Sequence, residues 1–413
     1  MITAQTPFAP RHMGSTGADV QEMLKLIGFS SLDEMTDAIV PADIRLKAPL
    51  DLPAPMAEQE ALEALREVLS ANKPVHSLIG QGYYGTYMPA VIQRNVYENP
   101  GWYTAYTPYQ PEIAQGRLEM LMNFQTMIAG LTGLPVANAS MLDEGTAAAE
   151  AVNLCISSKN RSNTFFVADT CYPQTIDVIR TRCETTGVNL IVGDWRSLEP
   201  ASVAGLAGVL VQYPDNLGSV EDYSEFFAKC HAAKVLCVVA ADLLALTVLK
   251  EPGAFGADVC VGTTQRFGIP MGFGGPAAAY MACSDALKRK LPGRYIGLSV
   301  DKDGKPAYRL ALQTREQHIR REKATSNICT AQVLTALLST FYAMYQGPQG
   351  LKDVAMTAHR LAAAFAAAVT AAGKKVVSAN YFDTVAVQAP GKAADLVAAA
   401  LSAGYNIRRV AED

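Results

Sequence analysis

The sequence predicts an α/β protein with a mostly parallel central sheet. From residue 140 on, short apolar runs rich in β-branched residues alternate with segments that have the apolar spacing of helices. The strand-like runs are Thr164–Ala168, Leu190–Val192, Val209–Gln212, Val235–Ala241 and Val259–Gly262. This alternation is typical of a parallel sheet covered by helices on both faces. The hydrophobic content of 50% is enough to fill a large core.

Helices are expected between these strands and after them. Three segments between the strands have helical apolar spacing, namely Gly145–Ser157, Gln174–Thr186 and Val220–Ala233. A β-hairpin is predicted in Arg294–Leu312, around the turn Asp301–Gly304. A helical region over Gln317–Gln346 then precedes an Ala-rich helix, Leu351–Ala372, that Gly373 ends.

The two ends of the chain have a different organisation. Near the start, helices are predicted at Ala18–Leu26, Leu32–Ala38 and Glu58–Ala71, with Val40–Pro55 as an extended arm. Near the end, the predicted elements are a strand near Val376, a strand Thr384–Val387, a helix Ala393–Ala403 and a strand Ile407–Val410. No return element follows the last strand, so the smaller domain is expected to be incomplete. We therefore divide the chain into N-terminal helices and an arm (1–75), a large α/β domain (76–315), and connecting helices with a small α+β domain (316–413).

The composition argues against several classes of function. Lys and Arg number 35 against 39 Asp and Glu, with no block of like charge, so a footprint for nucleic acid is lacking. The 8 cysteines and 5 histidines are dispersed without CxxC or metal-ligand spacing, which favours free thiols and no metal site. The nearly apolar stretch Val235–Leu249 is too short to span a membrane, and residues 1–10 resemble no leader. A cytoplasmic protein is expected.

Asp242 is the most informative single position. It ends an apolar strand, at the edge of the sheet where open α/β proteins bind ligands. A carboxylate there requires a cationic or hydrogen-bonding partner. One such partner is the protonated ring nitrogen of pyridoxal phosphate. The alternative is an Asp that caps the following loop, and the residue alone leaves both interpretations open.

The glycine-rich loop Phe267–Pro276 follows the last predicted parallel strand. A pyridoxal-phosphate lysine is often found at such a place, because the Schiff base needs a primary amine. Here the chain has Gln265 and Arg266 instead. An amide forms no imine, and a guanidinium that is always protonated is a poor nucleophile. The loop therefore looks like a cofactor scaffold without its reactive group, although glycines also serve plain tight turns.

Two further features have alternative explanations. Gly145 and Thr146 open a helix and could cradle a phosphate, but Asp143 and Glu144 beside them would repel it, so helix capping is favoured. Aromatic residues gather in two loops, at Tyr83 and Tyr84 and in the segment 102–110. Such clusters line interfaces and clefts, or they pack in a core.

Several long stretches resemble one known family. They are Arg11–Gly14, Ile79–Thr86, Asn95–Gln115, Leu142–Ala151, Gln265–Pro276 and Leu310–Gln332. Over essentially its whole length the chain resembles the glycine cleavage system P-protein, a pyridoxal-phosphate-dependent glycine decarboxylase. The resemblance implies the fold type I of pyridoxal-phosphate enzymes. More narrowly, it points to the N-terminal half of the long single-chain form, in which the lysine belongs to the second half.

The resemblance also implies what the residues above do. Gln265 aligns with the coenzyme lysine of the second half, and Asp242 with the residue that binds the pyridine nitrogen. Asp242, Gly145 and Thr146 are then vestigial cofactor positions, and this chain is expected to hold no catalytic residue, no coenzyme and no metal. The whole protein is expected to decarboxylate glycine and to transfer the aminomethyl group to the lipoyl arm of the H-protein. Tyr172 departs from the His usual at its position.

The same resemblance indicates partners. The two halves of this family pack like a dimer of fold type I subunits, with active sites at the interface. The loop residues expected to line the neighbouring site and the lipoyl channel are Tyr83, Tyr84, Tyr106, Thr107 and Tyr109. A vacated interface on this chain alone could support a homodimer.

Other functions stay open at this point. The chain could be the separate non-lysine subunit of a two-subunit P-protein, or a non-catalytic binding or regulatory module of the same fold. An independent pyridoxal-phosphate enzyme is disfavoured by Gln265, because such an enzyme needs the lysine. A bacterial origin is expected, since no organellar presequence is visible.

Overall fold

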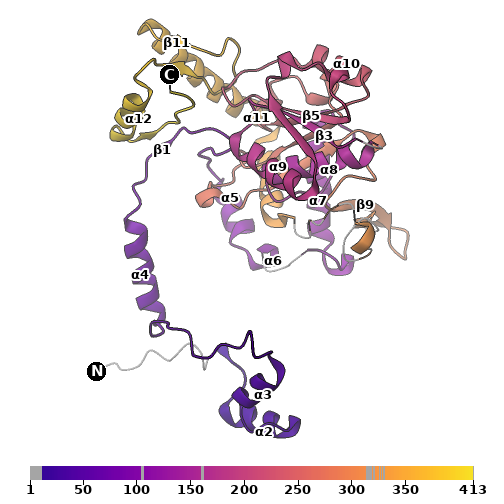
Figure 1. Ribbon diagram of the computed structural model, residues 1–413, viewed down its shortest axis with the longest axis vertical. Coiled ribbons are helices and arrows are strands. Elements are labelled where there is room, and N and C mark those ends of the chain that lie inside the picture. Colours follow the sequence, from indigo (N-terminus) through magenta and orange to yellow (C-terminus); the bar gives the residue numbers. More distant parts are fainter. Residues whose placement is uncertain are drawn as a thin grey trace. The chain divides into compact units, whose positions relative to one another are not determined.

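A computed structural model describes residues 12–103, 107–159, 162–312, 319, 321–324, 326, 328 and 331–412. The chain divides into two compact units, Met1–Pro74 and Val75–Asp413 (Figure 1). The further division at residue 316 stays a prediction.

The first unit consists of helices joined by irregular segments. The helices are α2 (Gly17–Ile27), α3 (Leu32–Ile39) and α4 (Glu58–Ser70), which confirms the three that were predicted. Side chains cap two of them: Thr16 accepts a hydrogen bond from the amide of Asp19 at 3.3 Å, and Ser31 one from Glu34 at 3.1 Å. These caps satisfy amide groups that a helix start leaves without a partner.

The second unit is built on a seven-stranded sheet with the strand order β2-β8-β7-β6-β5-β3-β4. Five neighbouring strands are parallel, as the sequence predicted; they are β3 (Thr164–Ala168), β4 (Asn189–Gly193), β5 (Leu206–Tyr213), β6 (Leu236–Ala241) and β7 (Val259–Thr263). Sequence reasoning missed the antiparallel edge, formed by β8 (Ala279–Cys283) and β2 (Val136–Ala137).

Helices pack against this sheet and bury its central strands, whereas the edge strand β4 is only partly buried. They are α7 (Gln115–Thr132), α8 (Glu144–Ser158), α9 (Pro173–Thr186) and α10 (Ser224–Ala232). α8 contacts β3, β5, β6, β7 and β8, and it lies beside α9 (Figure 1). Its buried face is rich in alanine, so the helix backbone approaches the strands closely. α8 thereby brings its own N-terminus to the sheet edge that carries the candidate site.

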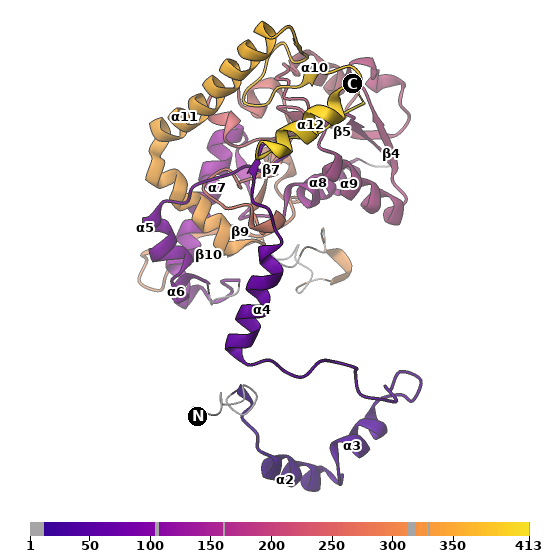
Figure 2. The same ribbon diagram turned by 90° about the vertical axis from the view of Figure 1, so that its left-hand side faces the viewer.

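After the sheet the chain forms a hairpin and a long helix. The predicted hairpin is confirmed, with β9 (Tyr295–Val300) antiparallel to β10 (Pro306–Ala311). α11 (Val333–Ala371) runs along one side of the unit (Figure 2) and breaks at Gly347, where φ is 66°. Of the helical region expected over Gln317–Gln346, residues 333–346 belong to α11 and Arg321–Lys323 form a short 3-10 helix, η10, while part of 317–332 lies outside the described residues. Among the described residues, α11 alone has the length and apolar composition of a membrane span, which is weak evidence for one; sequence reasoning had weighed only Val235–Leu249.

The C-terminal elements differ in part from those expected. β11 (Lys375–Val376), β12 (Val387–Gln388) and α12 (Ala393–Ser402) are present, but 384–386 are irregular, so the strand predicted at Thr384–Val387 is wrong for most of its length. The strand predicted at Ile407–Val410 is also wrong. The strand there is β13 (Tyr405–Asn406), which pairs in parallel with β1 (His76–Ser77). Its position is set by a partner over 300 residues away, which local apolar spacing does not reveal.

One close approach in the sheet fixes the strand that carries Asp242. The Tyr280 hydroxyl on β8 donates to the carbonyl of Ala241 on β6 at 2.8 Å, across the backbone of Gly262. A Cβ at Gly262 would lie 2.3 Å from the Ala241 oxygen and 2.5 Å from the Tyr280 hydroxyl. Only glycine fits this crossing.

We expect Gly262→Ala to lower the free energy of unfolding by about 2 kcal/mol or more, because the strands would have to separate. Gly130→Ala is the matched control, since Gly130 is exposed on α7 with open space around its Cα. That change is expected to be neutral or to stabilise by up to about 1 kcal/mol. Equilibrium denaturation measures both, and equal stabilities of the two variants would contradict the packing described here.

Candidate functional site

Asp242 lies directly beyond β6, at the carboxyl edge of the sheet, and its side chain is only 7% exposed. One carboxylate oxygen, Oδ1, accepts the amide of Leu244 at 2.9 Å. The other, Oδ2, pairs with Nη1 of Arg266 at 2.5 Å. The contact with Leu244 agrees with the interpretation of Asp242 as a cap of the next loop, and the cation that the carboxylate meets is Arg266 of this chain.

Arg266 joins Asp242 to a second carboxylate from far along the sequence. Its Nη2 lies 2.6 Å from Oδ2 of Asp383, and its guanidinium carbon lies 3.9 Å from the centre of the Tyr84 ring. Burial opposes the charged form of Arg266, but Asp242 and Asp383 raise its pKa above the ordinary value. Burial raises the pKa of Asp242, and the guanidinium counteracts this. A charged arginine between two carboxylates is the arrangement that these contacts support.

Gln265 is buried and its amide is fully engaged. Nε2 donates to the carbonyls of Tyr84 at 2.8 Å and of Ile269 at 2.6 Å, while Oε1 accepts the Tyr84 amide at 3.3 Å. Thr86 donates to the same Ile269 carbonyl at 2.6 Å. The side chain thus ties the loop 80–86 to the turn after β7. Its position at the end of a strand agrees with the sequence analysis, and its use as a tie between loops was not foreseen.

The start of α8 shows where the expected phosphate repulsion needs correction. Asp143 caps the helix by accepting the amide of Thr146 at 2.7 Å. Glu144, by contrast, is half-buried, and its Oε1 accepts hydrogen bonds from Gln212 Nε2 at 3.5 Å and from Thr175 Oγ1 at 3.4 Å. Burial raises the pKa of Glu144 to about 8, so at neutral pH this carboxyl is mainly neutral and does not repel an anion as the sequence argument assumed.

The C-terminal segment closes over the site. Ser378 donates to the carbonyl of Leu217 at 2.7 Å, and Arg408 contacts the side chain and carbonyl of Asn216, each at 2.7 Å. A Cβ at Gly218 would lie 2.0 Å from the carbonyl oxygen of Thr384. Sequence reasoning missed Asp383 and Arg408, because nothing local marks which distant loop will return to a sheet edge.

The aromatic candidates are not all in one place. Tyr84 lies against Arg266, whereas the Tyr109 hydroxyl contacts Nη2 of Arg294 at 2.5 Å. Thr107 is buried and Tyr83 half-buried. Tyr106 lies outside the described residues. The structure therefore places Tyr84 beside Asp242 and Arg266, at the carboxyl edge of the sheet. The roles of the other aromatic candidates and of Thr107 stay predictions.

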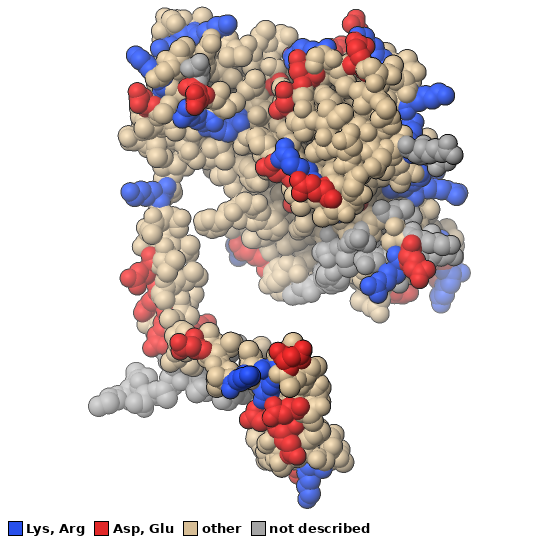
Figure 3. Space-filling model, viewed as in Figure 1, with Lys and Arg blue, Asp and Glu red and all other residues tan. Residues whose placement is uncertain are grey.

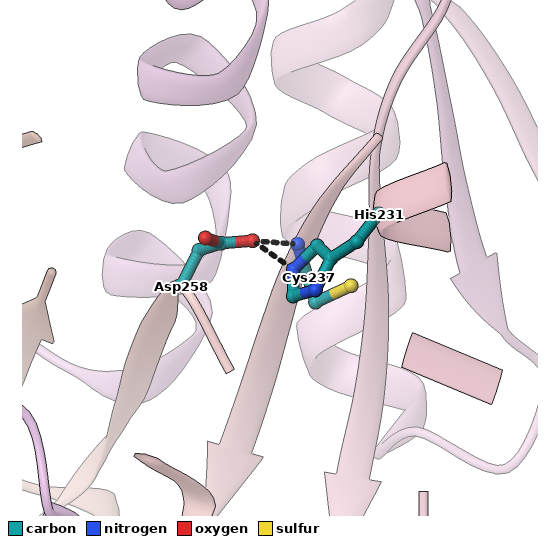
Figure 4. Close-up of side chains that lie close together, drawn as sticks. All are labelled: His231, Cys237 and Asp258. Carbon is teal, nitrogen blue, oxygen red and sulfur yellow. Dashed lines mark hydrogen bonds and ion pairs between the residues drawn. The ribbon is translucent and has the colours of Figure 1, made fainter. Parts of the chain in front are cut away.

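A second group of side chains has the composition of a metal site. Among the described residues, His231, Cys237 and Asp258 bring one ligand atom each to within 4.8 Å of one another. Oδ2 of Asp258 already pairs with His231 Nε2 at 2.9 Å and accepts the Cys237 amide at 2.8 Å. Burial raises the pKa of the Cys237 thiol, and its sulfur points away from Asp258 (Figure 4). Through these hydrogen bonds Asp258 ties α10, which carries His231, to β6, which carries Cys237.

Charge elsewhere on the second unit is mixed. On the face drawn in Figure 3, Lys and Arg side chains alternate with Asp and Glu, and no extended area of one sign is present. The described cysteines are free and buried.

A model of the glycine cleavage system P-protein family matches residues 10–413. The chain belongs to this family. Glycine dehydrogenase (decarboxylating) of Akkermansia muciniphila is 64% identical over 413 residues, which are 100% of this chain and 44% of that protein. The protein of the same description from Cereibacter sphaeroides is 55% identical over 404 residues, 42% of its length. The chain thus spans less than half of these curated relatives.

Solved structures agree with this membership. A glycine decarboxylase (P-protein) of the glycine cleavage system, in inhibitor-bound form, superposes with a TM-score of 0.84 and 37% identity, covering 96% of this chain and 91% of that one. The TDC of Oryza sativa, solved with PLP and tryptamine, gives a TM-score of 0.59 at 13% identity, covering 95% and 90%; this likeness shows the fold alone. The predicted fold type I is confirmed.

Pyridoxal phosphate, which this fold often carries, does not fit the residues present. Gln265, at the position that the family resemblance aligns with the lysine, has an amide without nucleophilic character, and the Asp242 carboxylate, which the resemblance aligns with the pyridine partner, is paired with a guanidinium. No step through the coenzyme is therefore assigned to this chain.

Glu144 gives a pH-dependent test of the site. Its folded-state pKa of about 8 lies above the ordinary 4.5, so the folded state favours the protonated carboxyl. The stability that the protonated carboxyl contributes is fully present below about pH 4.5 and is lost as the pH rises through about 8. We expect Glu144→Gln to stabilise the chain relative to wild type above pH 8, by up to about 4 kcal/mol, and to show little gain near pH 5.

The measurement is urea denaturation of both proteins across this range. Glu184→Gln, on the exposed face of α9, is the control and should show no such pH-dependent gain. A constant difference between wild type and Glu144→Gln at all pH values would contradict the raised pKa of this carboxyl.

Proposed function

We propose that this chain is the N-terminal, lysine-free half of a single-chain glycine decarboxylase. The observation that carries the proposal is Gln265, whose amide stands at the lysine position and makes three backbone hydrogen bonds. Relatives that are 64% and 55% identical are more than twice as long as this chain. The lysine-bearing half would then supply the reactive amine, and this half would complete the site from its side.

In this proposal the whole protein decarboxylates glycine and passes the aminomethyl group to the lipoyl arm of the H-protein. Pyridoxal phosphate is held by the other half. The isolated chain is inactive, because it has the amide of Gln265, and no lysine amine, at the position where the coenzyme would be bound. A cytoplasmic location in a bacterium fits the balanced charge and the bacterial relatives.

A second form of the same function has an observation in its favour. The chain covers 91% of a solved glycine decarboxylase chain, so proteins of this length exist in the family. That chain is 37% identical, against 64% and 55% for the longer relatives. The higher identities support the single-chain form over a separate non-lysine subunit. A purely regulatory module would differ from both, because no lysine-bearing partner would restore activity to it.

For the isolated chain mixed with pyridoxal phosphate, we expect no visible Schiff-base absorbance and no stoichiometric lysine adduct after borohydride reduction. We also expect no release of CO2 from glycine. Adding the lysine-bearing half should restore turnover, measured as exchange of labelled CO2 into glycine. A stoichiometric adduct, or turnover by the chain alone, would contradict the proposal, and failure of every lysine-bearing partner to restore turnover would favour a regulatory module.

The aromatic loop residues are proposed to line the neighbouring active site and its channel. In the intact protein, Tyr109→Phe and Tyr106→Phe are expected to lower glycine turnover or raise the KM for the lipoylated carrier, each by roughly tenfold, which corresponds to about 1.4 kcal/mol. For Tyr109 the cause would be loss of the hydroxyl that meets Arg294.

Tyr345→Phe is the matched control, since that tyrosine is exposed on α11. Steady-state kinetics with glycine and with H-protein as the varied substrates checks both variants. If they match the control in both assays, the channel assignment is wrong.

A further inference from the structure

We infer that Arg266 prevents this half from binding pyridoxal phosphate, independently of the missing lysine. Its guanidinium takes the place of the coenzyme's ring as the cationic partner of Asp242. The inference rests on the proposed function, in which this half descends from the same fold as the lysine-bearing one. It goes further, since it states that restoring the amine at position 265 would not restore a coenzyme site.

The contacts of Asp242 carry the first step. Its Oδ1 is used by the Leu244 amide and its Oδ2 by Arg266. The guanidinium side chain is 8% exposed and sits between two carboxylates that are 7% and 10% exposed. A pyridinium nitrogen needs the same carboxylate oxygen and the same space. Two cations cannot share that oxygen without repelling each other at short range.

Neighbouring aromatic rings carry the second step. The guanidinium lies 3.9 Å from the centre of the Tyr84 ring and 5.6 Å from that of Phe382. An aromatic ring and a carboxylate favour a flat cation placed between them, and a pyridinium would require the same two groups. The residues around Arg266 would therefore also suit the coenzyme ring, but the guanidinium fills the space between them.

The origin of the second carboxylate carries the third step. Asp383 belongs to the C-terminal segment, whose neighbour Thr384 contacts Gly218 beyond β5. Arg266 thus links the sheet edge to this segment without any ligand. Removing the arginine would leave two buried carboxylates facing each other, which is costly. The labelling experiment therefore neutralises Asp383 together with the removal of Arg266, so that the variant stays folded.

The test uses the intact protein containing both halves. Two variants are compared with wild type: Gln265→Lys, and the triple variant Gln265→Lys, Arg266→Met, Asp383→Asn. Each is incubated with pyridoxal phosphate, reduced with borohydride and digested, and the phosphopyridoxyl lysines are located by mass spectrometry. A matched control combines Gln265→Lys with Arg289→Met, which removes an exposed arginine. Glycine turnover by the lysine-bearing half reports that each variant is folded.

We expect label only in the second half for wild type, for Gln265→Lys and for the control, and additional label at position 265 in the triple variant. Label at position 265 in the single variant would overturn the inference, as would a triple variant that turns over glycine and yet takes up no label there. Label within residues 1–413 of the wild-type protein would instead overturn the proposed function. If the triple variant does not fold, the single variant and its control still decide the inference by the presence or absence of label at position 265.

Discussion

A single arginine between two buried carboxylates connects the main parts of this site. Arg266 follows β7, Asp242 follows β6, and Asp383 comes from the C-terminal segment. Tyr84 adds the loop 80–86 through its ring. Loss of one partner from such a buried group costs about 3–5 kcal/mol, because the remaining charge stays unpaired. The arrangement of these loops therefore depends on the arginine remaining in place.

Gln265 has a structural role in this chain. Its amide makes three backbone hydrogen bonds, so the turn after β7 is held without a coenzyme. In the proposed function, Gln265 provides an amide where the other half has a reactive amine, and Arg266 provides a guanidinium where the other half has a cationic ring. In the proposed single-chain enzyme this would free one half from catalysis and leave it to shape the site of the other.

The sequence predicted the five parallel strands well, because each is an apolar run rich in β-branched residues bounded by helical segments. It also placed Asp242 and Gln265 at neighbouring strand ends. It did not predict β2 and β8, because neither strand has a pattern of apolar residues that distinguishes it from the segments around it. Asp383 and β13 were missed because their partners lie far away in the sequence. The raised pKa of Glu144 depends on its burial, which the sequence alone does not predict.

The most direct test of the central claim is a double-mutant cycle for Arg266→Met and Asp383→Asn, measured by equilibrium unfolding of the intact protein. If the guanidinium neutralises Asp383, each single change destabilises, and the pair together costs less than the sum by at least about 1.5 kcal/mol. Effects that add within about 0.3 kcal/mol would show that the two side chains do not interact. The site would then have to be explained without this arginine.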